Sequence, residues 1–450
     1  MSELANLQSL DSKHFIHPFT DHNALAKAKT RVISKASGIY IYQQDDQPIL
    51  DGMSGLWCCN LGYGRTEIAD AVSSQLAQLP FYNSFFQCSH APAIELSQRL
   101  AEVAPAQLNT VFYTNSGSEA NDTMIRFAHR YWDLKGKPNK KTIISRHNGY
   151  HGSTIAGASL GGMSFMHDQF KGVDYIEHID QPYWFGEANG QEESTFGLQV
   201  AQQLEQKILE LGIDNVAAFI AEPIQGAGGV IIPPASYWPE IQRICDHYEI
   251  LLVADEVICG FGRLGTMFAS EYFNIKPDFI CFAKAVTNGY QPLGGVLISD
   301  RVADVIKDAG NDFAHGFTYS GHPASCAAAI ATLDILKNED IINKVNTDIG
   351  PYFQSRWQQL GEHPLIGEAR SIGMLGAIEL VADKNNSTRF ANGIAGPTCR
   401  DQCVKVGLVM RAVGDTMVVA PPLVMTHTEV DELFNKAWQA LDLTAAALAK

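Results

Sequence analysis

The sequence has no excess of basic residues and no long hydrophobic run. Of its 450 residues, 33 are Lys or Arg and 49 are Asp or Glu, which gives a net charge of −16. Nonspecific binding of nucleic acid needs a basic face, so this balance argues against a nucleic-acid partner. No apolar stretch approaches the roughly 18 residues of a membrane span, so we expect no membrane partner either.

Targeting and metal-binding signals are also scarce. The start, "MSELANLQSLDSKHF", has no basic region followed by an apolar one, so we expect no signal peptide. The nine cysteines are scattered, and only Cys58–Cys59 and the pair Cys399 and Cys403 are close in sequence. Neighbouring cysteines rarely form a bridge, and a pair four apart without nearby ligands is a weak metal signal. The sequence favours reduced thiols, no metal and a cytoplasmic location.

The composition is that of a globular chain. Apolar residues make up 46% of it and charged residues 18%. A chain of 450 residues is too long for one ordinary core, so two domains are expected. No internal repeat, low-complexity tract or obvious linker marks a boundary between them.

Strand-like runs alternate with helical patterns from about residue 65 to about residue 320. The runs are "TVFYT" (110–114), "KTIISR" (141–146), "VAAFIAEP" (216–223), "ILLVADEV" (250–257), "DFICFAK" (278–284) and "GGVLIS" (294–299). Runs that are apolar on both faces suit a sheet covered by helices, and the alternation predicts a mainly parallel α/β sheet. We expect a large α/β domain over residues 65–325.

The pattern changes after about residue 325. "ASCAAAIATLDIL" and "IINKVNTDIGPYFQSRWQQL" read as helices, and "GMLGAIELV" reads as a strand. A last helix is predicted to begin at a capping box of Thr426 and Glu429. Its apolar stripe consists of Val430, Leu433, Phe434, Trp438 and Leu441. These elements predict a small α+β domain formed by residues 1–64 and 326–450.

Polar side chains follow the predicted strands, at the edge where an open α/β sheet binds its ligands. They are Asn115, Ser116, Gly117 and Ser118 after the first run, Tyr150 and His151 after the second, then Glu222, Asp255, Glu256 and Lys284. Each has an ordinary explanation when taken alone. Lys284 could be a solvated surface lysine, Asp255 a cap, "TNSGSE" a capped helix start and Tyr150 a packing residue.

Together these residues suit pyridoxal 5′-phosphate. The aldehyde of that cofactor needs a lysine for a Schiff base, and its pyridine nitrogen needs a carboxylate that keeps it protonated. The phosphate needs backbone N–H groups at a helix N-terminus, and the ring needs an apolar or aromatic cover. A dinucleotide site is disfavoured because no GxGxxG follows a first strand.

The same segments resemble a known family. "YTNSGSEANDTMIR", "NGYHG", "AEPIQGAGG", "VADEVICGFGRLG" and "FAKAVTNGYQPLGG" stand here in the order typical of the class III aminotransferases. The resemblance covers roughly residues 30 to 445 and implies the fold-type I (aspartate-aminotransferase-like) architecture. "GLWCCNLGYG", "GFTYSGHP" and "MRAVGDTMVVAPPL" look most like the amine:pyruvate, or omega-, transaminase branch.

This resemblance assigns catalytic roles to two residues. Lys284 is expected to form the Schiff base and then to move the proton between substrate and cofactor, and Asp255 to pair with the pyridine nitrogen. Desolvation should lower the pKa of Lys284. Val257 and Tyr150 are expected on the two faces of the ring. Ala285 departs from the glycine of many relatives, which is tolerable unless the backbone there needs a positive φ.

Further contacts are implied around the cofactor and the substrate. Gly117 and Ser118 should bind the phosphate together with Thr318 of the partner subunit, and Glu222 should hold the ring region through hydrogen bonds. A homodimer with its sites at the interface is therefore expected.

The substrate pocket is expected to contain Trp57, Phe85 of the partner subunit, and Arg411. Arg411 should bind the carboxylate of the keto acid as a bidentate pair and move aside for an uncharged amine. The ordinary alternatives are that Trp57 and Phe85 are core aromatic residues and that Arg411 is a surface arginine. "GFGRLG" (260–265) reads as a structural turn.

The sequence thus predicts a pyridoxal-phosphate transaminase that moves an amino group from a primary amine or omega-amino acid to a keto acid, pyruvate first. Other class III activities, on taurine, a diamine or a biotin-pathway substrate, remain open. A racemase or decarboxylase is disfavoured by the Arg411 motif. A cofactor-binding regulator without turnover is disfavoured because Lys284 and Asp255 are both present.

Overall fold

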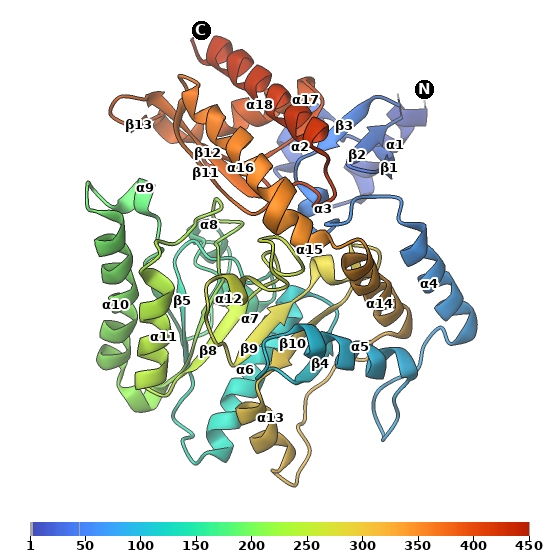
Figure 1. Ribbon diagram of the computed structural model, residues 1–450, viewed down its shortest axis with the longest axis vertical. Helices are drawn as coiled ribbons and strands as arrows, with labels where there is room; N and C mark the ends of the chain where they lie inside the picture. The colour runs from blue at the N-terminus through green and yellow to red at the C-terminus, as the bar shows by residue number, and fades with distance from the viewer. Residues whose placement is uncertain (1–2, 45, 450) are drawn as a thin grey trace.

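The computed structural model describes residues 3–44 and 46–449. One large sheet with its covering helices forms one region, and two smaller sheets and the C-terminal helix lie against it (Figure 1). In the residues described, no helix is both long enough and apolar enough to cross a membrane.

The large sheet has seven strands in the order β4-β10-β9-β8-β7-β5-β6. They are β4 (Thr110–Thr114), β5 (Thr142–Arg146), β6 (Ile176–Ile179), β7 (Val216–Ala221), β8 (Leu251–Asp255), β9 (Phe279–Phe282) and β10 (Gly294–Ile298). Strand β10 is antiparallel to both of its neighbours, and the other pairs are parallel. The predicted mainly parallel sheet is therefore present. Strand β6 was not predicted, because "IEHI" has too few apolar residues to stand out.

Helices cover both faces of this sheet, which explains its apolar strands. In β7, Phe219 packs in the cluster that contains residues of α10 (Glu193–Leu211) and α11 (Tyr237–His247). Its neighbour Ile220 packs in the cluster that contains residues of α6 (Gly117–Leu134). Successive strand side chains point to opposite faces, so a run must be apolar throughout when both faces are buried.

Other helices complete this part of the chain. They are α4 (Thr66–Gln78), α5 (Ala91–Val103), α7 (Ile155–Leu160), α8 (Ser164–His167), α9 (Trp184–Glu187), α12 (Ala269–Tyr272), α13 (Asp300–Lys307) and α14 (Pro323–Asn338). Helix α14 packs against α4 and α5 and leads toward the smaller sheets.

Segments from both ends of the chain meet in the smaller sheets. One sheet contains β1 (Ile33–Ser37), β2 (Tyr40–Gln43), β3 (Pro48–Asp51) and β14 (Leu408–Val409), with β3 parallel to β14. The other contains β11 (Ile366–Ile372), β12 (Leu375–Asp383), β16 (Thr416–Val419) and β15 (Arg411–Val413), with β13 (Thr388–Arg389) beside β12. The pairing of β3 with β14 places the N-terminal strands next to the C-terminal segment.

Helices α15 (Ile341–Lys344), α16 (Gly350–Gln359), α17 (Ala395–Lys405) and α18 (His427–Leu448) accompany these sheets. The predicted capping box of α18 is present, with Thr426 and Glu429 bonding to each other's backbone N–H. Of its predicted apolar stripe, Val430, Leu433 and Leu441 are buried, and Phe434 and Trp438 are partly buried against the same core. The helix start was predictable here because caps are local features.

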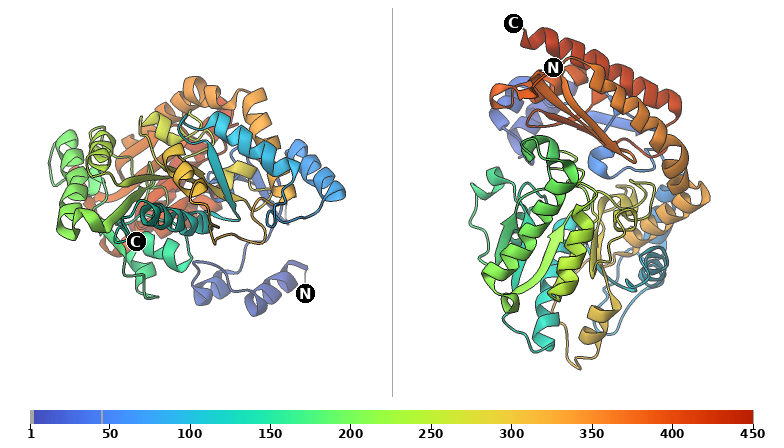
Figure 2. Two further views of the ribbon diagram at one scale, coloured as in Figure 1. Left: turned by 90° about the horizontal axis from the view of Figure 1, so that it is seen from below. Right: turned by 60° about the vertical axis from the view of Figure 1, so that its left-hand side comes forward.

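The first two helices, α1 (Glu3–His14) and α2 (His22–Ala28), bury no residue. In the left-hand view of Figure 2 they stand off the main body of the chain. A short helical turn, α3 (Ser54–Trp57), follows β3 and lies between the smaller sheets and the large one.

Candidate active site

A cavity of about 370 Å³ opens at the carboxyl ends of the large parallel sheet. This volume lies within the range of small-molecule sites, roughly 300–1,000 Å³. Its lining includes Gly117, Ser118, Tyr150, Glu222, Asp255, Val257 and Lys284. These are the predicted cofactor-binding residues with the exception of Thr318.

Lys284 follows β9 closely and begins a short 3₁₀ turn, Lys284–Thr287. Its own backbone is left-handed, with a φ of 51°, whereas Ala285 has no positive φ. The methyl group of Ala285 is therefore accommodated, and the strained residue is the lysine, as is frequent at functional sites. Burial lowers the pKa of Lys284 below its ordinary value, and Cys58, Asp255 and Glu222 act in the opposite direction.

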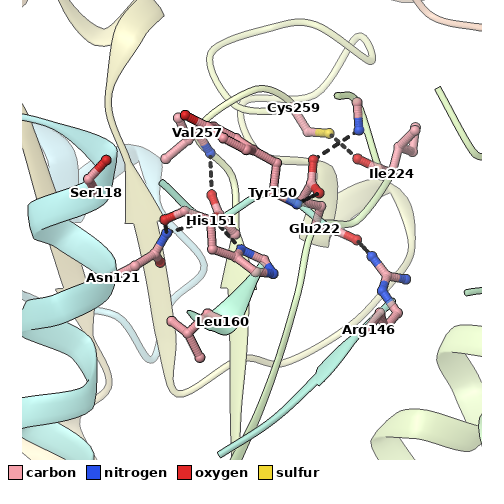
Figure 3. A network of polar contacts seen from close by, with 12 residues as sticks. Ser118, Asn121, Arg146, Tyr150, His151, Leu160, Glu222, Ile224, Val257 and Cys259 are labelled. Atoms are coloured by element: carbon pink, nitrogen blue, oxygen red, sulfur yellow. Dashed lines mark hydrogen bonds and ion pairs between the residues drawn. The ribbon is translucent and has the colours of Figure 1, made fainter. Parts of the chain in front are cut away.

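Asp255 ends β8 and is held by three donors. Its Oδ2 accepts hydrogen bonds from His151 Nδ1 at 2.7 Å and Asn121 Nδ2 at 2.9 Å, and its Oδ1 accepts one from the N–H of Val257 at 3.1 Å. Figure 3 shows His151, Asn121 and Val257 close to one another. The carboxylate is buried, so these donors fix its direction.

His151 and Asn121 are the site residues whose role sequence reasoning missed. His151 follows a strand and stands beside Tyr150, so the sequence did offer a signal for it. Asn121 lies one turn inside α6, and its Nδ2 also donates to the carbonyl of His151 at 2.7 Å. A polar residue at a buried helical position carries no such signal until its partner is known.

Glu256, the neighbour of Asp255, points elsewhere. It is fully buried and accepts the N–H groups of Ala269 at 2.9 Å and Ser270 at 2.6 Å, at the start of α12. Burial raises the pKa of Glu256 to about 7, and these N–H groups oppose the rise. Of the two neighbouring carboxylates, only Asp255 lines the cavity.

Glu222 links the strand after which it stands to the loop that carries Tyr150. Its Oε1 accepts the N–H of Tyr150 at 3.0 Å, and its Oε2 accepts the N–H of Gly226 at 2.9 Å. Burial raises the pKa of this carboxyl. The ring of Phe19, from the N-terminal segment, meets Tyr150 edge-on with 6.3 Å between ring centroids. Nothing in the sequence pointed to Phe19.

The N-terminus of α6 offers an anion-binding site. Ser116 caps the helix by accepting the N–H of Glu119 at 3.2 Å, which leaves the first-turn N–H groups at Gly117 and Ser118 beside the cavity. The space there is tight. A Cβ on Gly117 would lie 3.0 Å from Val257 Cγ2, and one on Gly152 would lie 2.5 Å from Ser118 Oγ.

Trp57 and Arg411 do not line the cavity, but they lie beside its Lys284. The indole of Trp57 lies 5.7 Å from Lys284 Nζ and 5.4 Å from Arg411 Cζ, measured to the ring centroid. Burial lowers the pKa of the Arg411 guanidinium, and Tyr150 and Glu222 oppose this. The structure thus brings these two predicted substrate residues next to the predicted catalytic lysine.

Phe85 and Thr318 are not part of this cavity. Both are exposed, and neither lines it. They lie close to each other, because a Cβ on Gly316 would approach Phe85 Cζ to 3.1 Å and Ser84 Oγ donates to the carbonyl of Ser320 at 3.3 Å.

The residues in the cavity fit pyridoxal 5′-phosphate. A helix N-terminus at Gly117 and Ser118 suits the phosphate, and the charged carboxylate of Asp255 suits the pyridine nitrogen. Lys284 supplies a primary amine of lowered pKa, and Val257 and Tyr150 offer two covers for a flat ring. Gly117 and Gly152 keep open the space that a side chain would fill.

Comparison with known proteins agrees with this interpretation. The family model for class III aminotransferases matches residues 23–441. The putrescine–pyruvate aminotransferase of Pseudomonas aeruginosa is 52% identical over 442 residues, which cover 98% of this chain and 97% of that protein. Gamma aminobutyrate transaminase 3 of Solanum lycopersicum is 43% identical over 94% of this chain and 83% of its own length.

Solved structures show the same similarity. The omega transaminase of Pseudomonas jessenii in complex with PMP is 39% identical, with a TM-score of 0.95, and the match covers 98% of this chain and 99% of that one. Sequence, fold and donor set therefore agree: the chain belongs to the class III aminotransferases and uses pyridoxal 5′-phosphate as its cofactor.

Proposed function

We propose that the chain transfers the amino group of a primary amine or omega-amino acid to a keto acid, with pyruvate as the preferred acceptor. One observation carries this proposal. The indole of Trp57 lies close to both the Lys284 amine and the Arg411 guanidinium, so a base and an anion-binding group stand beside one apolar ring. Such a site suits a substrate that is apolar in one half-reaction and a carboxylate in the other.

The similar proteins support this substrate class. The 52% identical relative is a putrescine–pyruvate aminotransferase, which makes a diamine the second candidate donor. In one solved structure, a thermostable omega transaminase variant engineered for the synthesis of bulky amines, a tryptophan, a phenylalanine and an arginine were replaced. These are the residue types of Trp57, Phe85 and Arg411.

The roles of the residues follow from their contacts. Bound pyridoxal phosphate supplies an electron sink that makes the proton on the amine-bearing carbon acidic. Lys284 removes that proton and returns it at the other end, since its Nζ is the amine of lowered pKa in the cavity. Asp255 would pair with the pyridine nitrogen, and His151 and Asn121 hold the Asp255 carboxylate in its direction.

We assign the remaining cofactor contacts to the residues that the sequence analysis predicted. Gly117 and Ser118 bind the phosphate through the helix N-terminus. Val257 and Tyr150 pack on the two ring faces, and Glu222 holds the loop of Tyr150 in place through its N–H.

Arg411 binds the carboxylate of the keto acid as a bidentate pair. When the amine donor carries no carboxylate, the flexible side chain moves away from the pocket. The Trp57 ring is the apolar surface against which both kinds of substrate lie.

We further propose a homodimer in which Thr318 and Phe85 of the partner subunit complete each site. Large apolar side chains are exposed around both residues, which is typical of a contact surface. They are Phe81, Tyr82, Phe85, Phe86 and Tyr319. The division into a domain of residues 65–325 and one of residues 1–64 and 326–450 is also part of this proposal. All nine cysteines are free, which favours the cytoplasm.

An absorbance titration tests the proposal. The purified protein is loaded with pyridoxal phosphate and mixed with one amine at a time, including putrescine, an omega-amino acid, taurine and an arylalkyl amine. A donor is expected to bleach the band of the bound cofactor, and pyruvate is expected to restore it. If no donor bleaches the band, or if pyruvate never restores it, the proposed function is wrong.

A further inference from the structure

The turn that carries Trp57 has an unusual backbone. Ser54, Gly55, Leu56 and Trp57 have φ values of 41°, 56°, 72° and 64°, so four consecutive residues are left-handed. L-residues avoid this conformation, and only glycine adopts it readily. Three of the four residues are not glycine. A run of this kind persists only where surrounding contacts hold it.

Asp51, the last residue of β3, provides most of those contacts. Its Oδ1 accepts the N–H of Met53 at 2.9 Å. Its Oδ2 accepts the N–H of Gly55 at 2.6 Å and the hydroxyl of Tyr63 at 2.5 Å. The carboxylate is 3% exposed, so water does not compete for these bonds. The Asp51 carboxylate therefore connects the beginning and the middle of the turn to Tyr63, which follows the turn in the sequence.

Ser54 anchors the same turn to the rest of the chain. Its hydroxyl donates to the carbonyl of Ala420 at 2.5 Å and accepts from Arg263 Nη2 at 3.0 Å. Arg263 is fully buried and also donates to the carbonyl of Met374 at 3.2 Å. This arginine belongs to the glycine-rich segment 260–265, which thus has a role in holding the turn.

The turn, and not the indole, decides where the Trp57 ring lies. Within the described residues, Nε1 of Trp57 is buried and has no hydrogen-bond partner. The ring is thus directed by its backbone and by packing. It meets Lys284 Nζ and Arg411 Cζ at similar distances, 5.7 and 5.4 Å from its centroid. A shift of the turn moves the wall of the substrate pocket and the resting contact of Arg411 together.

We propose that Asp51 is a positioning residue for amine specificity. By holding the left-handed turn through Met53, Gly55 and Tyr63, it fixes the indole of Trp57 and so sets the size of the amine that the pocket accepts. This inference rests on the proposed function, because it assumes that Trp57 forms the wall of the amine pocket.

Two substitutions, one milder than the other, test whether the hydrogen bonds of Asp51 hold the turn. Tyr63→Phe removes one of the three donors, and Asp51→Asn removes the charge and puts an amide N–H₂ where an acceptor is needed. Tyr40→Phe is the matched control. Its hydroxyl donates to a carboxylate too, Glu432 Oε2 at 2.7 Å, and it lies on β2 beside β3, but it does not touch the turn.

The first readout is the ratio of kcat/KM for a slim donor, butylamine, to that for a bulky one, 1-phenylpropylamine, with pyruvate as acceptor. We expect the ratio to fall about 3- to 10-fold in Tyr63→Phe and more than about 10-fold in Asp51→Asn, because a loosened turn lets the indole yield to the larger amine. Tyr40→Phe should leave the ratio unchanged. Equal losses for both donors would overturn the proposal, since a merely structural role lowers both alike.

The second readout does not need turnover. The pyridoxal-phosphate-loaded enzyme is labelled with 5-fluorotryptophan, which gives signals for its six tryptophans, and Trp57→Phe identifies the one that belongs to Trp57. We expect that signal to shift or broaden in the Asp51 and Tyr63 variants while the others stay in place. An unmoved Trp57 signal would overturn the proposal. If the wild-type enzyme turns over no amine with pyruvate, the proposed function fails, and this signal still decides whether Asp51 holds the turn.

Discussion

The two sides of the candidate active site are built from different kinds of structure. On one side, which we call the strand-end side, Glu222, Asp255 and Lys284 each stand at the carboxyl end of a strand of one sheet. On the other, the substrate side, Trp57 sits on a left-handed turn and Arg411 on the edge strand β15 of a smaller sheet. The strands of the first side are buried between the two clusters on the faces of the large sheet, whereas Trp57 on the second side packs in a separate, smaller cluster.

This difference suits the two tasks of the site. Proton transfer tolerates little displacement, and buried strands with helices on both faces resist displacement. Substrate exchange between an amine and a keto acid needs a side that can contact two kinds of group, and an indole beside a guanidinium offers both an apolar and a charged contact. Substitutions on the strand-end side should therefore affect every substrate, whereas those on the substrate side should discriminate between substrates.

The largest effect is expected for Lys284→Ala. Loss of the proton-transferring amine should lower turnover by more than about 10³-fold with every donor and acceptor, because general acid–base catalysis contributes on that scale. Rates of both half-reactions, followed by absorbance of the bound cofactor, provide the measurement. Lys140→Met is the control, since Lys140 is also buried and its pKa is lowered to about 8 by burial, yet it lies away from the cavity. A comparable loss in the control would contradict the assignment.

Asp255→Asn should come next, with a loss of about 10²-fold or more in both half-reactions, because removal of a charge that stabilises the transition state costs this much. Its neighbour provides the control. Glu256→Gln should leave the half-reaction rates near those of the wild type, since Glu256 contacts the start of α12 and not the cavity. Similar losses in both variants would show that the carboxylates act through the fold alone.

The raised pKa of Glu256 also predicts how the stability of the fold depends on pH. Its pKa is raised by burial from 4.5 to about 7, so between these values the folded chain binds more protons than the unfolded chain. The contribution of Glu256 to the free energy of unfolding is therefore present at low pH and is lost as pH rises through about 7. Thermal unfolding from pH 5 to pH 8 should show a smaller decline in Glu256→Gln than in the wild type. An equal decline in both proteins would show that groups other than Glu256 cause the pH dependence.

The strand-end side could be predicted from the sequence and much of the substrate side could not. Apolar runs locate the strands, and the rule that ligands bind beyond their carboxyl ends groups Glu222, Asp255 and Lys284 by their order along the chain. Local pattern could not tell Asp255 from Glu256, because that choice depends on which way each side chain leaves the strand, and the family resemblance named Asp255. It gave no sign of the left-handed turn, since only Gly55 among its four residues favours a positive φ. Trp57 and Arg411 were named through family resemblance and not through local pattern.

On the substrate side, Arg411→Ala should raise KM for pyruvate about 10- to 100-fold, which corresponds to the loss of charge-assisted hydrogen bonds. The half-reaction with an uncharged amine should change little, because Arg411 then has no carboxylate to bind. Separate measurement of the two half-reactions by stopped-flow absorbance checks this. Arg411→Lys should restore part of the pyruvate affinity, since it returns the charge without the planar fork. Equal losses in both half-reactions would place Arg411 in the fold of the pocket and not in acceptor binding.

The smallest effect concerns Thr318, which belongs to neither side of the cavity in its own chain. If it completes the site of the partner subunit, Thr318→Ala should lower activity about 5- to 10-fold, the value of one ordinary hydrogen bond. Chains of Lys284→Ala, themselves inactive, should then rescue it. In a mixed dimer the Thr318→Ala chain keeps its lysine and receives an intact threonine from the other subunit. Activity per Thr318→Ala chain should therefore rise toward the wild-type value as Lys284→Ala is added in excess. The double variant Lys284→Ala/Thr318→Ala should give no rise when added in the same way. If the single variant gives none either, Thr318 does not act across an interface, and the strand-end side alone binds the phosphate.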